Sequence, residues 1–249
     1  MSRDERALEA GLSDPAVAPA LARGELEILG LLPRSSNYTF LVRATGEAGV
    51  QALGVYKPQR GEVPLWDFPE GTLCRREVAA YVVARSLGWP NVPPTILRDG
   101  PEGLGSVQTF VTFDPEEHYF TLQERFVEDF RKVAAFDLVV NNADRKGGHC
   151  LLGEDGRIWL IDHGVCFSAE PKLRTVIWEY MDEPIPPSLL ADIERLGMAL
   201  AEGGPDRDEL GALLNEEELL ALRRRIGEIA ASPVFPGPGG DRPFPWPPV

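Results

Sequence analysis

The stretch FDLVVNNADRKGGHCLLGEDGRIWLIDHGVCF, residues 136–167, decides the fold of this chain. Asp144 follows the apolar run FDLVV and Asp162 follows the apolar run RIWLI, so each carboxylate lies at the polar end of a hydrophobic segment. The GEDG sequence between the two runs is typical of a tight turn and predicts a short β-hairpin. Because a hairpin brings its two ends together, we expect Asp144 and Asp162 to face a common cleft. Two acids in one cleft can bind a metal ion on a polyphosphate, and one of them can act as a base toward a hydroxyl group.

The composition is that of an ordinary soluble globular protein. The chain has 249 residues, of which 43% are hydrophobic and 26% are charged, and this length is enough for one large domain or two lobes. No apolar run approaches the roughly 18 residues of a membrane span, and the acidic N-terminal sequence lacks the hydrophobic segment of a signal peptide. We therefore expect a cytoplasmic protein without an integral membrane segment. The three cysteines, an odd number without framework spacing, argue against a disulfide scaffold.

The formal net charge of −14 at pH 7 argues against nucleic acid, or an anionic membrane surface, as a bulk partner. A local basic patch around Arg75, Arg76, Arg145 and Lys146 is still compatible with this charge. Nothing in the sequence indicates an oligomeric state.

Residues 25–57 alternate between apolar and polar side chains. The segments LEILGLL, YTFLVRA and VQALGVYK predict a three-stranded antiparallel meander. Its first turn contains Ser35, Ser36 and Asn37, and the backbone N–H groups and hydroxyls of such a turn can cradle an anion. The alternative is an ordinary solvent-exposed hairpin turn, because the turn carries no glycine-rich phosphate motif.

Lys57 ends the third of these strands, and Glu77 lies near the start of the next predicted helix, residues 72–87, which ends at Gly88. The apolar neighbours of Lys57 direct its ammonium group either into a cleft or outward along a sheet edge. The helix is amphipathic and places Glu77 beside its buried face. An inward-facing Lys57 could therefore form an ion pair with Glu77.

The remaining segments complete the predicted architecture. Residues 92–111 predict two more strands and so a sheet of five, and the loop at 59–71 contains Trp66 and Phe68, for which we expect packing rather than ligand recognition. The second half of the chain predicts mainly helices, at residues 117–140, 188–203 and 215–231, with an irregular segment at 165–187.

The last 18 residues contain seven prolines, which excludes a helix or a central strand at 232–249. We expect an extended tail that is either disordered or docked through Phe235, Phe244 and Trp246. A polyproline ligand for another protein is the less favoured alternative.

Taken in order, these motifs resemble the phosphatidylinositol 3- and 4-kinase superfamily, especially the type II phosphatidylinositol 4-kinases and their bacterial relatives. The HipA-type protein kinases share the same skeleton more distantly. The motifs that carry the resemblance span residues 30–185 and are SSNYTFLV, VYKP, RREVAAY, SVQTFV, NNADR and IDHG. The resemblance implies an α+β, two-lobed protein-kinase-like fold. Its N-lobe would be an antiparallel sheet plus a helix at 1–111, and its C-lobe would be small and mostly helical at 112–231, before the proline-rich tail at 232–249.

The resemblance also implies a role for each motif residue. Lys57 would bind the phosphates of ATP and Glu77 would anchor it, while the turn at Ser35, Ser36 and Asn37 would cover the phosphates. Backbone groups from about Gln108 to Val111 would hold the adenine edge. The remaining roles fall to three residues of the second lobe: Asp144 as the base or orienting group for the acceptor hydroxyl, Arg145 as a stabiliser of the transferring phosphoryl charge, and Asp162 as the ligand of Mg²⁺ or Mn²⁺. Helix capping for Asp144 and a strand-end turn for Asp162 are the structural alternatives.

His149 departs from the kinase pattern, which has a metal-binding Asn at this place. Because Mg²⁺ prefers oxygen ligands, His149 indicates a preference for Mn²⁺, a single-metal site built on Asp162, or a loss of catalysis. A structural role for His149 is an equally weighted alternative. For His163 we expect packing or support of a neighbouring ligand, and for Cys150 a place in the core.

The leading functional hypothesis is an ATP-dependent phosphotransferase. Its hydroxyl acceptor would be an inositol-type head group, a small polyol or a protein Ser/Thr. A nucleotide-binding pseudokinase with a regulatory role is the first alternative, motivated by His149 and the missing glycine-rich loop. A kinase-fold adenylyltransferase is the second.

Overall fold

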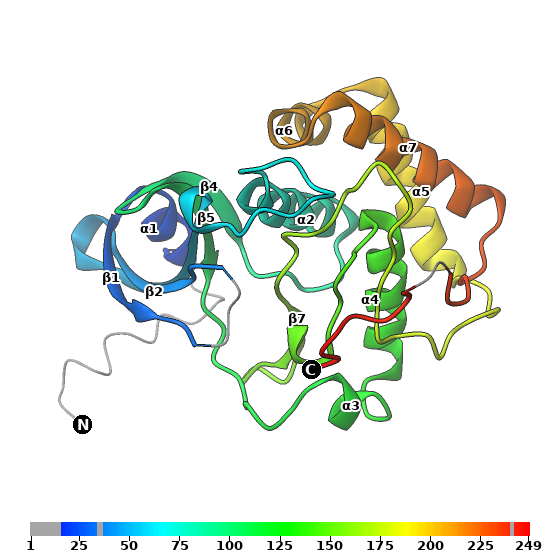
Figure 1. The fold of residues 1–249 in the computed structure, drawn as a ribbon, viewed down its shortest axis with the longest axis horizontal. Helices are drawn as coiled ribbons and strands as arrows, with labels where there is room; N and C mark the ends of the chain where they lie inside the picture. Colours follow the sequence, from blue (N-terminus) through cyan, green and yellow to red (C-terminus); the bar gives the residue numbers. More distant parts are fainter. Residues whose placement is uncertain (1–15, 34–36, 240–241) are drawn as a thin grey trace. The chain divides into compact units, whose positions relative to one another are not determined.

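The computed structural model describes residues 16–33, 37–239 and 242–249, which form two compact units (Figure 1). The first unit comprises Met1–Val78 and Pro93–Val111, and the second comprises Ala79–Val92 and Thr112–Val249. This division differs from the predicted one in two respects. Residues 79–92 and the proline-rich tail both cluster with the second unit, because their contacts are made there.

The first unit is built on a five-stranded antiparallel sheet, as predicted from the alternating segments. Its strands lie in the order β1-β2-β3-β5-β4, and each neighbouring pair is antiparallel. The strands are β1 (Glu25–Leu31), β2 (Phe40–Thr45), β3 (Gln51–Pro58), β4 (Thr95–Gly100) and β5 (Gly103–Thr109), with short 3₁₀ turns η2 (Glu47–Gly49) and η3 (Gln59–Gly61).

Helix α1 (Val17–Arg23) packs against β2, β3 and β5, and Figure 1 shows the curved sheet wrapping around it. Gly54 permits this close approach, since a Cβ atom there would lie 2.9 Å from Cδ2 of Leu21 on the helix. The β3 strand alternates strictly between buried and partly exposed residues. Tyr56 faces the core around α1, and Lys57 therefore points to the opposite face of the sheet.

Helix α2 (Leu73–Leu87) begins where the loop at 59–71 ends. The Glu62 carboxylate accepts hydrogen bonds from the backbone N–H groups of Leu73 and Cys74, which satisfies two donors that the first turn of a helix leaves unpaired. Of the two aromatic residues in this loop, Phe68 is buried as predicted. Trp66 is 94% exposed, so the packing predicted for it is wrong.

The second unit is mainly helical. Its elements are the second half of α2, then α3 (Tyr119–Leu122), α4 (Val127–Val140), η4 (Gly147–His149), β6 (Cys150–Leu152), β7 (Ile158–Leu160), α5 (Pro187–Glu202), α6 (Pro205–Leu213) and α7 (Glu216–Ala231). The predicted hairpin is present, because β6 and β7 pair antiparallel. The irregular segment at 165–187 is also confirmed.

Two helix predictions need correction. The helix expected at 117–140 is broken into α3 and α4, and the break lies at Phe126, whose φ of −125° and ψ of 41° are not helical. Helix α6 was not predicted. It begins at Pro205, directly after Gly203 and Gly204, whose positive φ angles end α5 and turn the chain.

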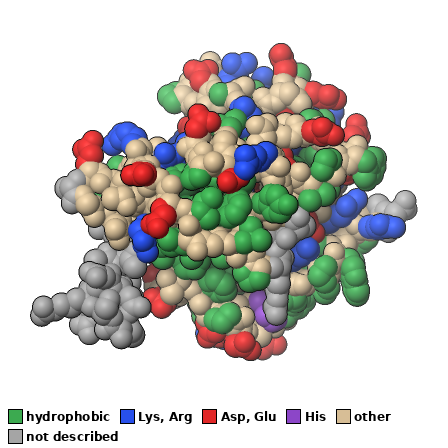
Figure 2. All heavy atoms as spheres, turned by 60° about the vertical axis from the view of Figure 1, so that its left-hand side comes forward, with side chains coloured by type: hydrophobic (Ala, Val, Ile, Leu, Met, Phe, Trp, Pro, Cys, Tyr) green, Lys and Arg blue, Asp and Glu red, His purple; other side chains and the backbone are tan. Residues whose placement is uncertain are grey.

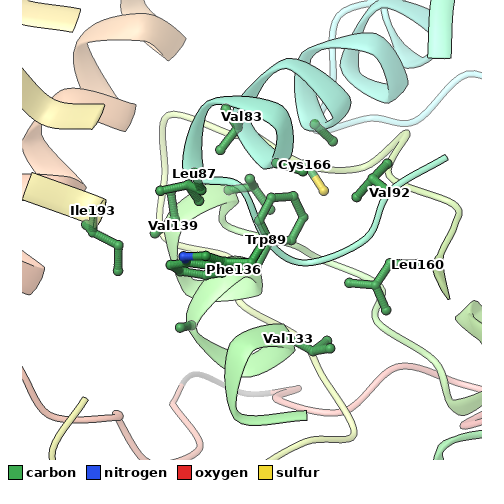
Figure 3. Close-up of a cluster of buried hydrophobic side chains, with 14 of the residues drawn as sticks. Val83, Leu87, Trp89, Val92, Val133, Phe136, Val139, Leu160, Cys166 and Ile193 are labelled. Carbon is green, nitrogen blue, oxygen red and sulfur yellow. The ribbon is translucent and has the colours of Figure 1, made fainter. Parts of the chain in front are cut away.

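The hydrophobic core of the second unit joins segments far apart in the sequence. Figure 3 shows Val83 and Leu87 of α2, Phe136 and Val139 of α4, and Ile193 of α5 around one cluster. The labelled set in this view is completed by Trp89, Val92, Val133, Leu160 and Cys166. Cys150 also belongs to the core, as predicted, and burial raises the pKa of its thiol to about 12.

The described part of the proline-rich tail is extended and docked at its start. Phe235 is buried and its ring lies 5.7 Å from that of Tyr180. The predicted docking is therefore confirmed for Phe235. It does not extend to Trp246, which is 88% exposed.

One face of the described part of the chain shows how its charged side chains are distributed. On the face shown in Figure 2, acidic and basic side chains are intermixed around hydrophobic ones. Among the described helices, none combines the length and hydropathy needed to span a bilayer.

The core of Figure 3 makes a first prediction. Phe136→Ala removes a fully buried ring, and we expect it to lower the free energy of unfolding by about 3–5 kcal/mol. Met198→Ala on the exposed side of α5 should change it by no more than about 0.5 kcal/mol. Urea unfolding followed by circular dichroism measures both, and similar values for the two variants would contradict this core.

Candidate functional site

Lys57 and Glu77 form an ion pair within the first unit. The Lys57 ammonium donates to Oε1 of Glu77, which lies in the second turn of α2. Glu77 is buried and Lys57 is partly exposed, so the lysine supplies the positive charge that a buried carboxylate requires. The ion pair predicted from the strand and helix positions is therefore present. It can hold the ammonium in one orientation toward an anion.

The turn between β1 and β2 is only partly described. Ser35 and Ser36 lie outside the described residues. The Asn37 side chain is directed to the loop that follows β3, where its Oδ1 accepts a hydrogen bond of 2.7 Å from the backbone N–H of Val63. This bond holds the end of the turn against the loop.

Gln108 does not fit the predicted contact with an adenine edge. It lies inside β5, between Val55 of β3 and Thr95 of β4, so its backbone groups belong to the sheet. Its side-chain amide donates to the Thr95 hydroxyl at 2.8 Å and is buried. The strand predicted over SVQTFV does continue past Gln108, to Thr109, so Gln108 lies within the sheet and not after it.

In the second unit, the loop that carries Asp144 begins at Asn141. This residue ends α4 in the left-handed conformation, with φ of 52°. Its side chain donates to the carbonyls of Ser168 and Glu170 and accepts from the N–H of Lys172. One amide thereby fixes the end of α4 to the irregular segment that follows β7.

A buried ion pair between Arg145 of this loop and Asp137 of α4 supports the same loop. Arg145 donates from Nε and Nη2 to the Asp137 carboxylate at 2.9 Å, and both side chains are fully buried. Arg145 also donates to the Ile161 carbonyl at 3.1 Å and lies 2.9 Å from Nε2 of His163. Burial lowers the pKa of Arg145, but the attraction of Asp137 outweighs it, and the net pKa is raised. Arg145 therefore stays charged.

These contacts contradict the role predicted for Arg145. A guanidinium that is buried and bonded to Asp137 and Ile161 has no access to a transferring phosphoryl group. The packing predicted for His163 is confirmed, because its buried ring lies edge-on to that of Phe136, with the ring centroids 5.7 Å apart.

Asp144 lies on the loop between these anchors. Its backbone N–H donates to Oδ1 of the buried Asn142, and its carboxylate lies 3.3 Å from Nζ of Lys146. Burial raises the pKa of the Asp144 carboxyl above its usual range. Lys146 opposes this shift, and the negative charge of Asp162 adds to it. The two aspartates are thus close enough to interact, as the hairpin predicted.

Asp162 follows β7 in the left-handed conformation, with φ of 62°, which is uncommon for a residue with a side chain. Its carboxylate is 49% exposed, and Oδ2 lies 3.2 Å from Nε2 of His149. Nδ1 of His149 accepts from the Lys146 N–H at 3.3 Å, which places the ring proton on Nε2 and makes it a donor to Asp162. His149 therefore orients Asp162 in this arrangement.

The donor set restricts what ion this site can hold. Among the described residues there is no group of three or more His, Cys, Asp or Glu side chains arranged to hold a metal. Mg²⁺ is commonly bound through one or two carboxylates together with substrate phosphates. Asp162, with Asp144 nearby, fits that kind of site and does not fit an all-protein cage.

Three positioning residues were missed in the sequence. The loop that carries Asp144 is held in place by Asp137, Asn141 and Asn142. Only Asp137 could have been recognised as a buried polar residue from the sequence. A charged residue inside the apolar run FDLVV marks a buried polar group that needs a partner.

Comparison with known proteins adds to this geometry. The family model for phosphatidylinositol 3- and 4-kinase matches residues 96–198. Protein Rv2133c of Mycobacterium tuberculosis is 41% identical over 263 residues, a match that covers 91% of this chain and 93% of the relative. Phosphatidylinositol 4-kinase gamma 4 of Oryza sativa subsp. japonica is 32% identical over 51% of this chain, and the match covers 26% of the rice protein.

Solved structures agree in fold. The Helicobacter pylori proinflammatory kinase CtkA superposes with a TM-score of 0.52 at 12% identity, covering 85% of this chain and 93% of that one. A Golgi casein kinase with Mn/ADP bound superposes with a TM-score of 0.56 at 14% identity, covering 92% of this chain and 76% of that one. At such identities the likeness shows the fold alone, which is α+β and of the atypical protein kinase type. The chain belongs to the same family as Rv2133c and is a phosphatidylinositol 3- and 4-kinase-like protein.

Proposed function

We propose that this protein is an ATP-dependent phosphotransferase that transfers the γ-phosphate to a hydroxyl acceptor. The observation that carries the proposal is the cluster of Asp144, Asp162 and His149 at the open end of the β6–β7 hairpin. The acceptor classes are an inositol-type head group, a small polyol or a protein Ser/Thr. A cytoplasmic location and the absence of a nucleic-acid partner are part of the same proposal.

In the first unit, Lys57 is assigned to the phosphates of ATP. Its ammonium is held by the buried Glu77, so its orientation is set before an anion arrives. A preoriented charge stabilises a phosphate at a lower entropic cost than a free lysine side chain would.

Asp162 is assigned to the divalent ion, Mg²⁺ or Mn²⁺, which would neutralise charge on the transferred phosphate. The hydrogen bond from Nε2 of His149 limits rotation of the Asp162 carboxylate. Of the readings that the sequence left open for His149, this geometry favours a single-metal site built on Asp162. His149 is then a positioning residue rather than a ligand.

Asp144 is assigned to the acceptor hydroxyl. Its partial burial raises the pKa of its carboxyl, which makes the carboxylate a stronger base than an exposed aspartate. Lys146 lies 3.3 Å from this carboxylate and can hold it in position.

The purified chain should transfer label from γ-labelled ATP to water or to a supplied alcohol when Mg²⁺ or Mn²⁺ is present. Asp162→Asn should abolish metal-dependent nucleotide binding. Asp144→Ala should leave binding intact and reduce turnover by about 10² or more, the scale for loss of a general base. Isothermal titration and label transfer measure the two properties separately.

Equal loss of nucleotide binding in both variants would show that the two roles are misassigned. Binding without transfer, with either metal and with acceptors of all three classes, would favour the pseudokinase alternative, which His149 motivates. Transfer of label from the α-phosphate would favour an adenylyltransferase.

The burial of Asp144 also predicts a pH-dependent cost in stability. Because the folded state holds the Asp144 proton more tightly than the unfolded state, the contribution of this residue to stability falls as pH rises from the usual aspartate pKa of about 3.9 through the raised value. Asp144→Asn should therefore be more stable than the natural protein at neutral pH, with the gain shrinking as pH approaches about 3.9. Urea midpoints at several pH values measure this gain. The exposed Glu228→Gln is the carboxylate control, and equal midpoints for Asp144→Asn and the natural protein at neutral pH would refute the prediction.

Arg145→Met tests the structural role assigned to the buried arginine. It leaves the buried Asp137 carboxylate without its cationic partner, although the Asn142 amide still donates to it, and we expect a loss of about 3–5 kcal/mol in the free energy of unfolding. Arg207→Met, on the exposed surface of α6, should cost no more than about 0.5 kcal/mol. Normal stability with lost turnover in Arg145→Met would instead restore a direct role in phosphoryl transfer.

A further inference from the structure

The end of the proline-rich tail lies on the loop that carries Asp144. The backbone N–H of Gly147, three residues after Asp144, donates to the Pro248 carbonyl at 2.7 Å. The N–H of Thr175 donates to the Pro243 carbonyl at 3.1 Å. The backbone of Thr175 in turn forms a parallel β-bridge with that of Arg145, which belongs to the same loop as Asp144. Figure 1 shows the corresponding red segment, which ends at the point marked C.

The start of the tail is firmly anchored. The N–H of Phe235 donates to the Glu183 carbonyl at 2.9 Å, and the Phe235 carbonyl accepts from the N–H of Asp182 at 3.0 Å. The carbonyl of Pro233 accepts a further hydrogen bond from Ile185, and the Phe235 ring is buried. This anchor keeps the end of the tail at a high local concentration near the loop.

At the end of the tail the aromatic side chains are far more exposed than Phe235 at its start. Pro245 is buried, but Phe244 is 55% exposed and meets the second unit through an edge-on contact with Trp178, with ring centroids 6.4 Å apart. Nε1 of Trp178 is buried and has no hydrogen-bond acceptor within the described ranges, so this contact gains nothing from the indole N–H. A buried anchor followed by a more exposed end is the arrangement of a segment that can dock and release.

The end of the tail, residues 243–249, could not itself accept a phosphoryl group. Residues 243–249 read PFPWPPV and contain no Ser, Thr or Tyr, so they offer no hydroxyl to a phosphoryl donor. Their carbonyls nevertheless accept hydrogen bonds from Gly147 and Thr175, as an extended peptide would when bound beside Asp144.

We propose that residues 243–249 are an intramolecular inhibitory segment that occupies the acceptor side of the Asp144 loop as a hydroxyl-free pseudosubstrate. This inference rests on the phosphotransferase function proposed above. It predicts that the natural chain is partly closed to its acceptor and that release of the segment opens the site.

The test compares the full chain with a variant that ends at Arg242. Hydrogen exchange at the Gly147 and Thr175 amides should be faster in the shortened chain, because both lose their acceptors. Release of phosphate from γ-labelled ATP, with water as the acceptor, should rise about tenfold if the closed form holds roughly nine-tenths of the molecules. A synthetic PFPWPPV peptide added to the shortened chain should reverse both changes.

Two full-length variants guard against a folding artefact. Phe244→Ala removes the ring that contacts Trp178 and should raise phosphate release part of the way. Met198→Ala removes a side chain that is 58% exposed on α5, away from this segment, and should leave phosphate release unchanged.

The outcomes separate the two proposals. Unchanged or lower phosphate release from a folded shortened chain would overturn the inhibitory role, and unchanged amide exchange would overturn the docking. If neither chain releases phosphate with Mg²⁺ or Mn²⁺, the proposed function fails. In that case, binding of the peptide to the shortened chain would still support docking, and no binding would overturn it.

Discussion

The buried ion pair between Asp137 and Arg145 is the interaction on which the candidate site of the second unit depends. It joins α4 to the loop that carries Asp144, and the same guanidinium reaches the carbonyl of Ile161, the residue before Asp162. One side chain therefore sets the spacing of the two aspartates. A pair of this kind is expensive to desolvate and gains little net stability over an apolar pair, so its value here is positional.

The site combines this buried ion pair with two partly exposed carboxylates, those of Asp144 and Asp162. Asp144 is held by Asn142 and Lys146, while Asp162 adopts a backbone conformation that is unusual for a residue with a side chain and receives a hydrogen bond from His149. Two carboxylates near each other, one of them partly buried, lower stability unless a cation is present. Strain and charge repulsion of this sort are common where a protein binds ions, because the groups are arranged for a ligand rather than for the empty fold.

Much of the architecture was predictable because it depends on local patterns. Alternating apolar residues specified the five strands of the first unit, and the GEDG turn specified the β6–β7 hairpin. The break between α3 and α4 was not predictable, since the whole segment favours a helix and only packing around Tyr119 and Phe130 turns the chain there. The exposure of Trp66 was likewise invisible, because an aromatic residue in a loop reads as core until its neighbours are known.

By itself the sequence determined the order of the motifs and the nearness of Asp144 to Asp162, because these follow from strand, helix and hairpin periods. It also predicted the Lys57–Glu77 pair, on the condition that Lys57 faces inward. Tertiary structure alone decided what lies beneath and beside those residues. It buried Arg145 against a carboxylate eight positions earlier, enclosed Gln108 between two strands, and brought the last residues of the chain onto Gly147. Burial and hydrogen-bond partners depend on segments that are distant in the sequence, and no local period encodes them.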